Sequence, residues 1–214
     1  MRNIVERFWD ADAGLFADTL DHQHFSEHAQ CLAVLGGLLD EARIDSIRDR
    51  IDRRGIARTT VYFSHYLFEA ARKLKRPDLM FDRLELWYSF RGMGLKTLLE
   101  APEPSRSDCH AWSSHPLFHC YATILGIRPG AAGFQRVEIE PCLGDLTEAA
   151  GSIPHPSGGA ISVSIVKREE CTAFRISLPP GIPGVLHWQG RRIPFSGSLE
   201  CEMPVARVEE IEFA

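Results

Sequence analysis

The sequence predicts an α+β protein in which helices come first and a small β-sandwich follows. Up to about residue 130, apolar residues recur every three or four positions, which is the period of an amphipathic helix. From Val137 onward the pattern is short and alternating, as expected for half-buried strands. The change of character at Pro129 and Gly130 divides the chain into the segments 1–130 and 131–214.

Helices account for the first segment, and each expected helix has an apolar face or a recognisable end. Ser26 can start the first helix, and Gly55 is a plausible C-cap of the second. Thr59 or Thr60 can cap the third, and Pro77 suits the first turn of the fourth. The five expected helices cover about 25–39, 41–54, 59–74, 77–93 and 116–126.

Short strands account for the second segment. Ile161, Val163 and Ile165 alternate with serines, and a similar alternation follows around Phe174 and Ile176. Pro and Gly clusters between these runs are turn signals. Seven or eight short strands fit before the last residue, which favours an antiparallel sandwich.

Antiparallel helices joined in pairs of about forty residues are the units from which an α/α toroid is built. Five helices form only part of such a ring, because they cannot close it. Their apolar faces would stay exposed unless another segment or chain covers them. The sequence therefore predicts either a complementary part of the ring or self-association.

The composition excludes several functional classes. The chain has 214 residues and a net charge of −5 without a basic run, which argues against nucleic acid as a partner. No apolar run reaches the length of a membrane span, and the first residues lack a secretion-signal pattern. The six cysteines show no metal-binding spacing, so we expect reduced thiols in a cytoplasmic protein without a metal or cofactor.

The stretch 94–116 is the strongest candidate for a functional loop. It connects two helical patterns, is not periodic itself, and concentrates groups that bind and titrate. Loops held between rigid elements are where functional residues commonly lie. The candidate residues are Glu100, Arg106, Asp108, His110 and Trp112.

Four stretches resemble the C-terminal end of bacterial α-L-rhamnosidases, the inverting six-hairpin glycosidases of glycoside hydrolase family 78. These are FSEHAQCLAVLGGLL, ARTTVYFSHYLFEAARKL, GLKTLLEAPEPSRSDCHAWSSHPLF and ILGIRPGAAGFQRVEIEPCLGDL, at 25–39, 57–74, 94–118 and 124–146. The resemblance implies the last part of a twelve-helix (α/α)6 barrel followed by a β-sandwich. It also implies a rhamnose-containing glycoside as the substrate.

The resemblance assigns roles to two residues of the loop. Glu100 matches the general base in the Gly-Leu-x-Thr-x-x-Glu motif, and His110 matches a histidine that contacts the sugar. Lys96 and the pair Leu98–Leu99 replace the small or aromatic residues that are more usual at these positions of the motif. The family's motif for the general acid has no counterpart in the 214 residues, so we expect a fragment that is inactive alone.

The remaining candidate residues of this region can have either a structural or a functional role. Trp112 can lay its face against a sugar or pack between helix and loop. Arg106 and Asp108 can pair to hold the loop or contact the sugar directly. His115 and His119 have a spacing that can bind metal, but no third ligand is visible, so packing is expected.

Two functions therefore stay open. The first is a glycosidase fragment that carries the general base. The second is a non-catalytic carbohydrate-binding or self-association module left from such an enzyme. Activity of the isolated chain would point to a general acid among Glu27, Glu69 and Asp108.

Overall fold

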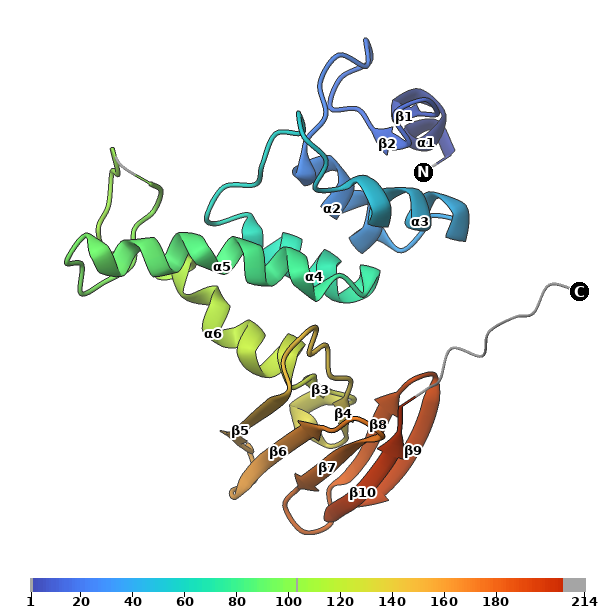
Figure 1. The fold of residues 1–214 in the computed structure, drawn as a ribbon, viewed down its shortest axis with the longest axis vertical. Coiled ribbons are helices and arrows are strands. Elements are labelled where there is room, and N and C mark those ends of the chain that lie inside the picture. Colours follow the sequence, from blue (N-terminus) through green and yellow to red (C-terminus); the bar gives the residue numbers. More distant parts are fainter. Residues whose placement is uncertain (1, 103, 206–214) are drawn as a thin grey trace, which may run out of the picture. The chain divides into compact units, whose positions relative to one another are not determined.

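The computed structural model describes residues 2–102 and 104–205. Their contacts group the chain into two compact units, one reaching to His119 and the other beginning at Cys120. The first unit is mainly helical and the second is built of strands (Figure 1). The α+β class expected from the sequence is thus confirmed. Among the described residues, no helix has the length and apolar character that crossing a membrane requires.

The helical unit contains six α-helices among the described residues, one more than expected. The additional helix lies at the N-terminus and is followed by a two-stranded hairpin, β1 (Trp9–Asp10) and β2 (Leu15–Phe16). The helices are α1 (Arg2–Phe8), α2 (Glu27–Gly36), α3 (Glu41–Arg50), α4 (Ser64–Leu74), α5 (Pro77–Gly92) and α6 (His115–His119).

The structure confirms one predicted helix cap and differs from the sequence at two others. The Ser26 side chain accepts a hydrogen bond from the Ala29 backbone N–H, so Ser26 caps α2 as predicted. Gly55 does not cap α3, because that helix already ends at Arg50. Of the two threonines expected before α4, Thr59 instead donates its amide and hydroxyl to Glu27, whereas the Thr60 hydroxyl oxygen accepts a hydrogen bond from the Phe63 backbone N–H in the turn that leads into the helix.

The fifth expected helix is shorter than the sequence suggests. The 3-10 turn η1 (Ala111–Ser114) leads into α6, and a π-helical turn, η2 (Cys120–Ile124), follows it. A π turn widens the backbone spacing and is frequently found near functional residues. The segment therefore changes its helical geometry at the junction of the two compact units.

A buried ion pair fixes α2 and α5 in the helical unit. The Arg83 guanidinium donates to both carboxylate oxygens of Glu27 at 2.8 Å, and both side chains are almost fully buried. Thr59 also bonds both residues, which satisfies further polar atoms. Helix α4 lies between these elements and supplies core side chains such as Leu67 and Phe68.

The second unit contains two four-stranded sheets, with strand orders β10-β7-β6-β5 and β3-β4-β8-β9 (Figure 1). Phe174 of one sheet meets Trp188 of the other, with ring centroids 5.0 Å apart. The strands are β3 (Ile127–Pro129), β4 (Val137–Ile139), β5 (Glu148–Pro154), β6 (Ala160–Lys167), β7 (Cys171–Ser177), β8 (Pro183–Trp188), β9 (Arg191–Ser196) and β10 (Ser198–Pro204).

The pairing is antiparallel with one exception. Strands β4 and β8 run parallel, with Val137 opposite Gly184 and Ile139 opposite Leu186. The expectation of a purely antiparallel sandwich is wrong at this pair. Parallel neighbours need a long connection between them, and the chain supplies it by building β5, β6 and β7 in the other sheet.

Candidate functional site

Backbone hydrogen bonds tie together the described residues of the loop 94–116, which are 94–102 and 104–116. The Glu100 amide donates to the Ser107 carbonyl at 2.9 Å, and the His110 amide donates to the Leu98 carbonyl at 2.8 Å. These bonds align the two limbs of the loop next to each other. Leu99 is fully buried with Val61 and Phe90, which anchors the loop to the helical core.

A second set of bonds ties the end of the loop to α5. The Trp87 indole N–H donates to the Ser113 carbonyl at 2.7 Å, and the Ser113 hydroxyl donates to the Leu99 carbonyl. Ser113 is fully buried, so these bonds are shielded from water. The positions of His110 and Trp112, just before Ser113, are therefore fixed by the helix.

Glu100 lies in this frame with its carboxylate held by an arginine. Arg106 donates to both carboxylate oxygens, from Nε to Oε2 at 3.1 Å and from Nη2 to Oε1. The hydrogen bond from Arg106, with the charges of Arg106 and His110, lowers the pKa of Glu100 below its usual value. Glu100 is therefore ionised at neutral pH, which a general base requires.

The two members of this ion pair differ strongly in exposure. The Glu100 side chain is 20% exposed, whereas the Arg106 side chain is 85% exposed. The sequence suggested a pair between Arg106 and Asp108, but the ion pair of Arg106 is with Glu100. Asp108 instead supports the loop through its backbone, since its carbonyl accepts a hydrogen bond from the Thr97 hydroxyl.

His110 and Trp112 lie together in the structure. Their rings meet edge to face with centroids 5.2 Å apart. Trp112 also lies against Tyr62, with centroids 4.5 Å apart, and 60% of the Trp112 surface is exposed. Trp112 is therefore not a core residue, although one part of its ring packs against Tyr62 and His110 and the rest is open to solvent. An exposed aromatic face is the kind of surface on which sugar rings bind.

Tyr62 belongs to the candidate site by its contact with Trp112, although its sequence position did not indicate this. It comes from the turn before α4, about fifty residues ahead of Trp112 in the chain, and contacts Tyr66 as well as Trp112. The available signal was the aromatic-rich stretch VYFSHY at 61–66. Aromatic residues in such a stretch equally well indicate packing of the helix against its neighbours, so the stretch did not predict a binding surface.

The histidines at 115 and 119 have a neighbour that was also missed. His65 on α4 lies beside them, and one ring nitrogen from each of the three histidines lies within 4.8 Å of the others. The statement that no third ligand is available is therefore wrong. Burial lowers the pKa of His115 to about 4, so this imidazole is neutral at pH 7.

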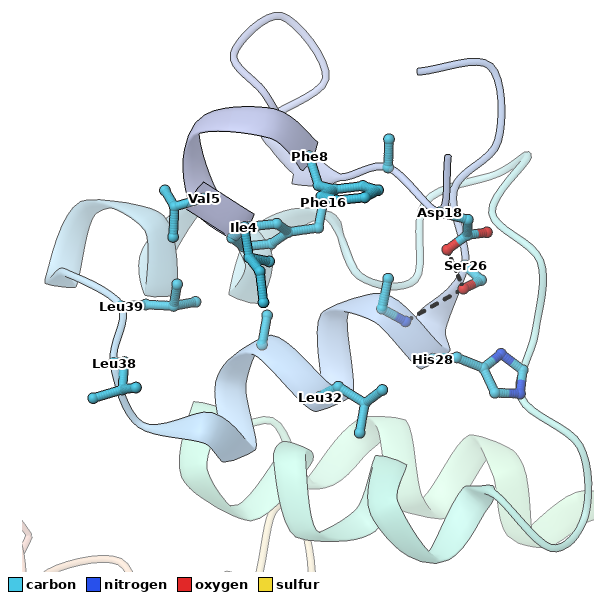
Figure 2. A pocket seen from close by; sticks show the side chains of 13 residues that line it. Ile4, Val5, Phe8, Phe16, Asp18, Ser26, His28, Leu32, Leu38 and Leu39 are labelled. Carbon is cyan, nitrogen blue, oxygen red and sulfur yellow. Dashed lines mark hydrogen bonds between the residues drawn. The ribbon is translucent and has the colours of Figure 1, made fainter. Parts of the chain in front are cut away.

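A separate apolar groove lies at the N-terminal end of the helical unit (Figure 2). Its volume is about 480 Å³, and side chains from α1, β2, α2 and the turn after α2 line it. In Figure 2, Ile4 and Val5 project from α1 on the side of Leu39 and Leu38, and Leu32 lies on α2 at the lower edge of the groove. None of the loop residues around Glu100 lines this groove, so it is a distinct feature.

Sequence comparison and structure comparison give different results for this chain. No family model and no curated protein matches the sequence. Solved structures do match the fold. The GH78 family rhamnosidase of Bacillus sp. GL1 is 27% identical with a TM-score of 0.68, and the match covers 86% of this chain and 23% of that protein.

Two further structures match at lower sequence identity. The α-L-rhamnosidase from Aspergillus terreus is 17% identical over 91% of this chain and 25% of its own, with a TM-score of 0.69. The Streptomyces avermitilis α-L-rhamnosidase complexed with L-rhamnose is 18% identical over 84% of this chain and 22% of its own, with a TM-score of 0.65. The chain thus has the fold of about a quarter of a GH78 α-L-rhamnosidase, a share that fits the C-terminal portion indicated by its motifs.

Proposed function

We propose that this chain is the part of an α-L-rhamnosidase-type glycoside hydrolase that carries the general base for inverting hydrolysis. The observation that carries the proposal is the position of Glu100. It is an ionised carboxylate in a rigid loop, with His110 and an exposed Trp112 in the same loop. The substrate class is a terminal α-L-rhamnoside, as the names of the structural neighbours suggest.

In this mechanism Glu100 removes a proton from the water that attacks the anomeric carbon. A second carboxyl group protonates the leaving oxygen on the other face of the sugar, about 6.5–9.5 Å away. His110 can donate a hydrogen bond to a sugar hydroxyl, and Trp112 can cover the apolar face of the sugar. The chemistry thus needs one carboxyl group beyond Glu100.

Arg106 sets a condition on this mechanism. It bonds both oxygens of Glu100, so the carboxylate can accept a proton from water only when Arg106 releases at least one of them. The high exposure of the Arg106 side chain permits such a movement. We infer that substrate binding displaces Arg106 and frees the base.

The general acid does not come from Glu27, because Arg83 and Thr59 engage that buried carboxylate. We propose that further helical hairpins supply the acid and complete the (α/α)6 barrel, which this chain enters with residues 1–130. These hairpins are part of the same polypeptide or of a separate chain, and residues 131–214 form the sandwich domain. A cytoplasmic location remains a prediction from the free cysteines.

The test is hydrolysis of an aryl α-L-rhamnoside in two assays. The isolated chain is expected to show no useful turnover. The chain joined to helical hairpins that complete the barrel is expected to be active, and Glu100→Gln should then lower kcat by about 10²–10⁴-fold. Arg175→Ala, at an exposed position on β7 of the strand unit, is the control and should keep full activity.

Two results would overturn the proposal. Ordinary glycosidase turnover by the isolated chain would mean that its acid lies within these residues. Full activity of Glu100→Gln in the completed barrel would exclude Glu100 as the base. Binding of L-rhamnose, measured by calorimetry with Trp112→Ala as the variant, separates loss of binding from loss of chemistry.

The alternative is a non-catalytic carbohydrate-binding or self-association module. The apolar groove favours it, because Leu32 and Leu38 at its edge are 59% and 63% exposed. Sedimentation of the purified chain distinguishes the two. A concentration-dependent dimer that Leu38→Glu abolishes, together with no activity in the completed barrel, would support the alternative.

A further inference from the structure

Three histidines from two separated parts of the chain meet in the helical unit. His65 lies in the first turn of α4, whereas His115 and His119 are the first and last residues of α6. One ring nitrogen of each lies within 4.8 Å of the other two. The spacing of four residues brings His115 and His119 to one side of their helix, and His65 completes the set.

The tautomer of His115 follows from its hydrogen bond. Nε2 lies 3.1 Å from the Val61 carbonyl oxygen, and a carbonyl only accepts, so Nε2 carries the hydrogen. Nδ1 then carries the lone pair. This Nδ1 is buried and has no hydrogen-bond partner. A buried acceptor without a partner destabilises the folded state unless something binds it.

The other two histidines are already close enough to share a ligand. Nε2 of His119 and Nδ1 of His65 are 3.0 Å apart, so one ring donates a hydrogen bond to the other. Two nitrogens bound to one tetrahedral zinc ion at about 2.0–2.1 Å each are separated by about 3.3–3.4 Å. A metal could therefore replace this hydrogen bond with little movement of either ring.

The surroundings favour a metal over solvent. His119 is fully buried, and the rings of Phe68 and Phe118 lie about it at 5.1 Å and 5.0 Å. Three neutral imidazoles suit zinc and its neighbours among the divalent transition metals, while carboxylate sites suit magnesium and calcium. The Val61 carbonyl already orients the His115 ring, as a backbone carbonyl that accepts a hydrogen bond from a metal-binding histidine commonly does.

We propose that His65, His115 and His119 form a binding site for one Zn²⁺ ion. The site joins α4 to α6, the short helix that follows the Glu100 loop. The three imidazoles leave a fourth position for water or an added ligand. The proposal does not depend on the glycosidase function, because it concerns only these side chains.

The test measures metal binding by the full chain. Zn²⁺ is titrated against a chromophoric chelator, and Co²⁺ is added separately to record the visible absorption of tetrahedral cobalt. We expect one ion per chain. Removing one ligand in His65→Gln should weaken binding by about 100-fold or more, since loss of even an orienting partner costs 10–100-fold. His24→Gln, at an exposed position, should bind as the unchanged chain does.

Thiols are the main competing ligands, because Cys109 and Cys120 are free and exposed. The double variant Cys109→Ser/Cys120→Ser is therefore measured in parallel and should keep the affinity. Circular dichroism without metal shows whether His65→Gln is folded. If that variant is unfolded, NMR shifts of the His115 and His119 ring nitrogens on adding Zn²⁺ to the unchanged chain decide the question.

Three outcomes would overturn the proposal. One is the absence of stoichiometric binding by the unchanged chain. Another is equal affinity in folded His65→Gln. The last is loss of binding in the cysteine double variant, which would assign the ion to thiols. Unchanged ring-nitrogen shifts at saturating Zn²⁺ would likewise show that the histidines only pack against each other.

Discussion

The helical unit and the strand unit differ in how completely each covers its own apolar side chains. Twelve large apolar side chains of the described residues are exposed, and ten of them precede Cys120. Only Leu146 and Val205 belong to the strand unit. Two facing sheets cover each other's apolar faces, whereas the helices of the first unit leave part of their apolar surface uncovered. The strand unit is thus nearly complete by itself, and the helical unit presents faces that other elements could cover.

The two units also differ in what lies inside them. The strand unit buries mostly Ile, Val, Leu and Phe, as a sandwich core does. The helical unit also buries the ion pair Glu27–Arg83, whereas the buried polar side chains of the described strand unit, Thr123, His155 and Thr172, form no such pair. Buried polar groups destabilise a protein when they lose their partners. The difference predicts that the two units respond differently to substitution.

Phe174→Ala should give the largest loss of stability in the strand unit. The side chain is 1% exposed and packs against Trp188, so its removal leaves a cavity between the sheets. Large-to-small changes of this kind cost about 3–5 kcal/mol. Hydrogen exchange of β6 and β7 measures the loss, with Leu146→Ala as a nearly neutral control. A loss under about 1 kcal/mol would show that the core can collapse around the missing ring.

Arg83→Ala should produce a similar loss in the helical unit for a different reason. It leaves the buried Glu27 carboxylate without its cation, which typically costs about 3–5 kcal/mol. Replacing both residues by apolar ones, in Arg83→Met/Glu27→Leu, should recover much of it. Denaturant unfolding of single and double variants measures the coupling. If Arg83→Ala and Arg83→Met/Glu27→Leu lost equal unfolding free energy, the loss would come from altered packing and not from the unpaired carboxylate of Glu27.

Gly126→Ala tests the backbone at the start of the strand unit and should cost about 1–3 kcal/mol. Gly126 has a left-handed backbone with a φ of 72°, and an added Cβ would lie 2.1 Å from the Glu140 carbonyl carbon. Gly158 also has a positive φ but open space around it. Gly158→Ala measures the cost of the positive φ alone, whereas Gly126→Ala adds the clash with Glu140, so thermal unfolding of both variants separates the two effects. Equal decreases in melting temperature for the two variants would exclude a contribution from the clash.

Periodicity was enough to find the helices and most strands, because each buries one face in a regular repeat. The helix ends were harder, since Thr59 bonds to the distant Glu27 instead of capping α4. The parallel pairing of β4 with β8 could not be foreseen, because strand order depends on contacts far apart in sequence. Short alternating patterns predict strands without predicting their neighbours.

The site was predictable only where its residues are close in sequence. Glu100, Arg106, His110 and Trp112 lie within one loop, and the motif drew attention to them together. Tyr62 contacts Trp112, and His65 lies beside His115 and His119, although each is about fifty residues away from these partners in the sequence. Only folding brings them together. The partner of Arg106 was mistaken because the shape of the loop brings Glu100, six residues back, to its guanidinium. Roles in catalysis and sugar binding remain predictions.

The smallest expected effect concerns the electrostatics of the loop, which belongs to the less complete unit. Arg106 holds the pKa of Glu100 below its usual value through a hydrogen bond and its charge, so Arg106→Ala should raise that pKa toward the ordinary range. Part of the shift should remain, because His110 also favours the ionised carboxylate. Carbon-13 NMR titration of the Glu100 carboxyl measures the change, and Arg168→Ala in the strand unit is the control.

The sign of the pH dependence follows from the lowered pKa. A carboxyl group whose pKa is lower in the folded state stabilises the protein above its unfolded pKa, and this contribution is lost as the pH falls through the folded value. Any stability difference between Arg106→Ala and the unchanged chain should therefore be present at neutral pH and disappear in acid. The difference should be small and sensitive to salt, because the pair is exposed to solvent. An unchanged Glu100 pKa in Arg106→Ala would show that the arginine does not hold the base in solution, and the displacement step proposed for catalysis would then be unnecessary.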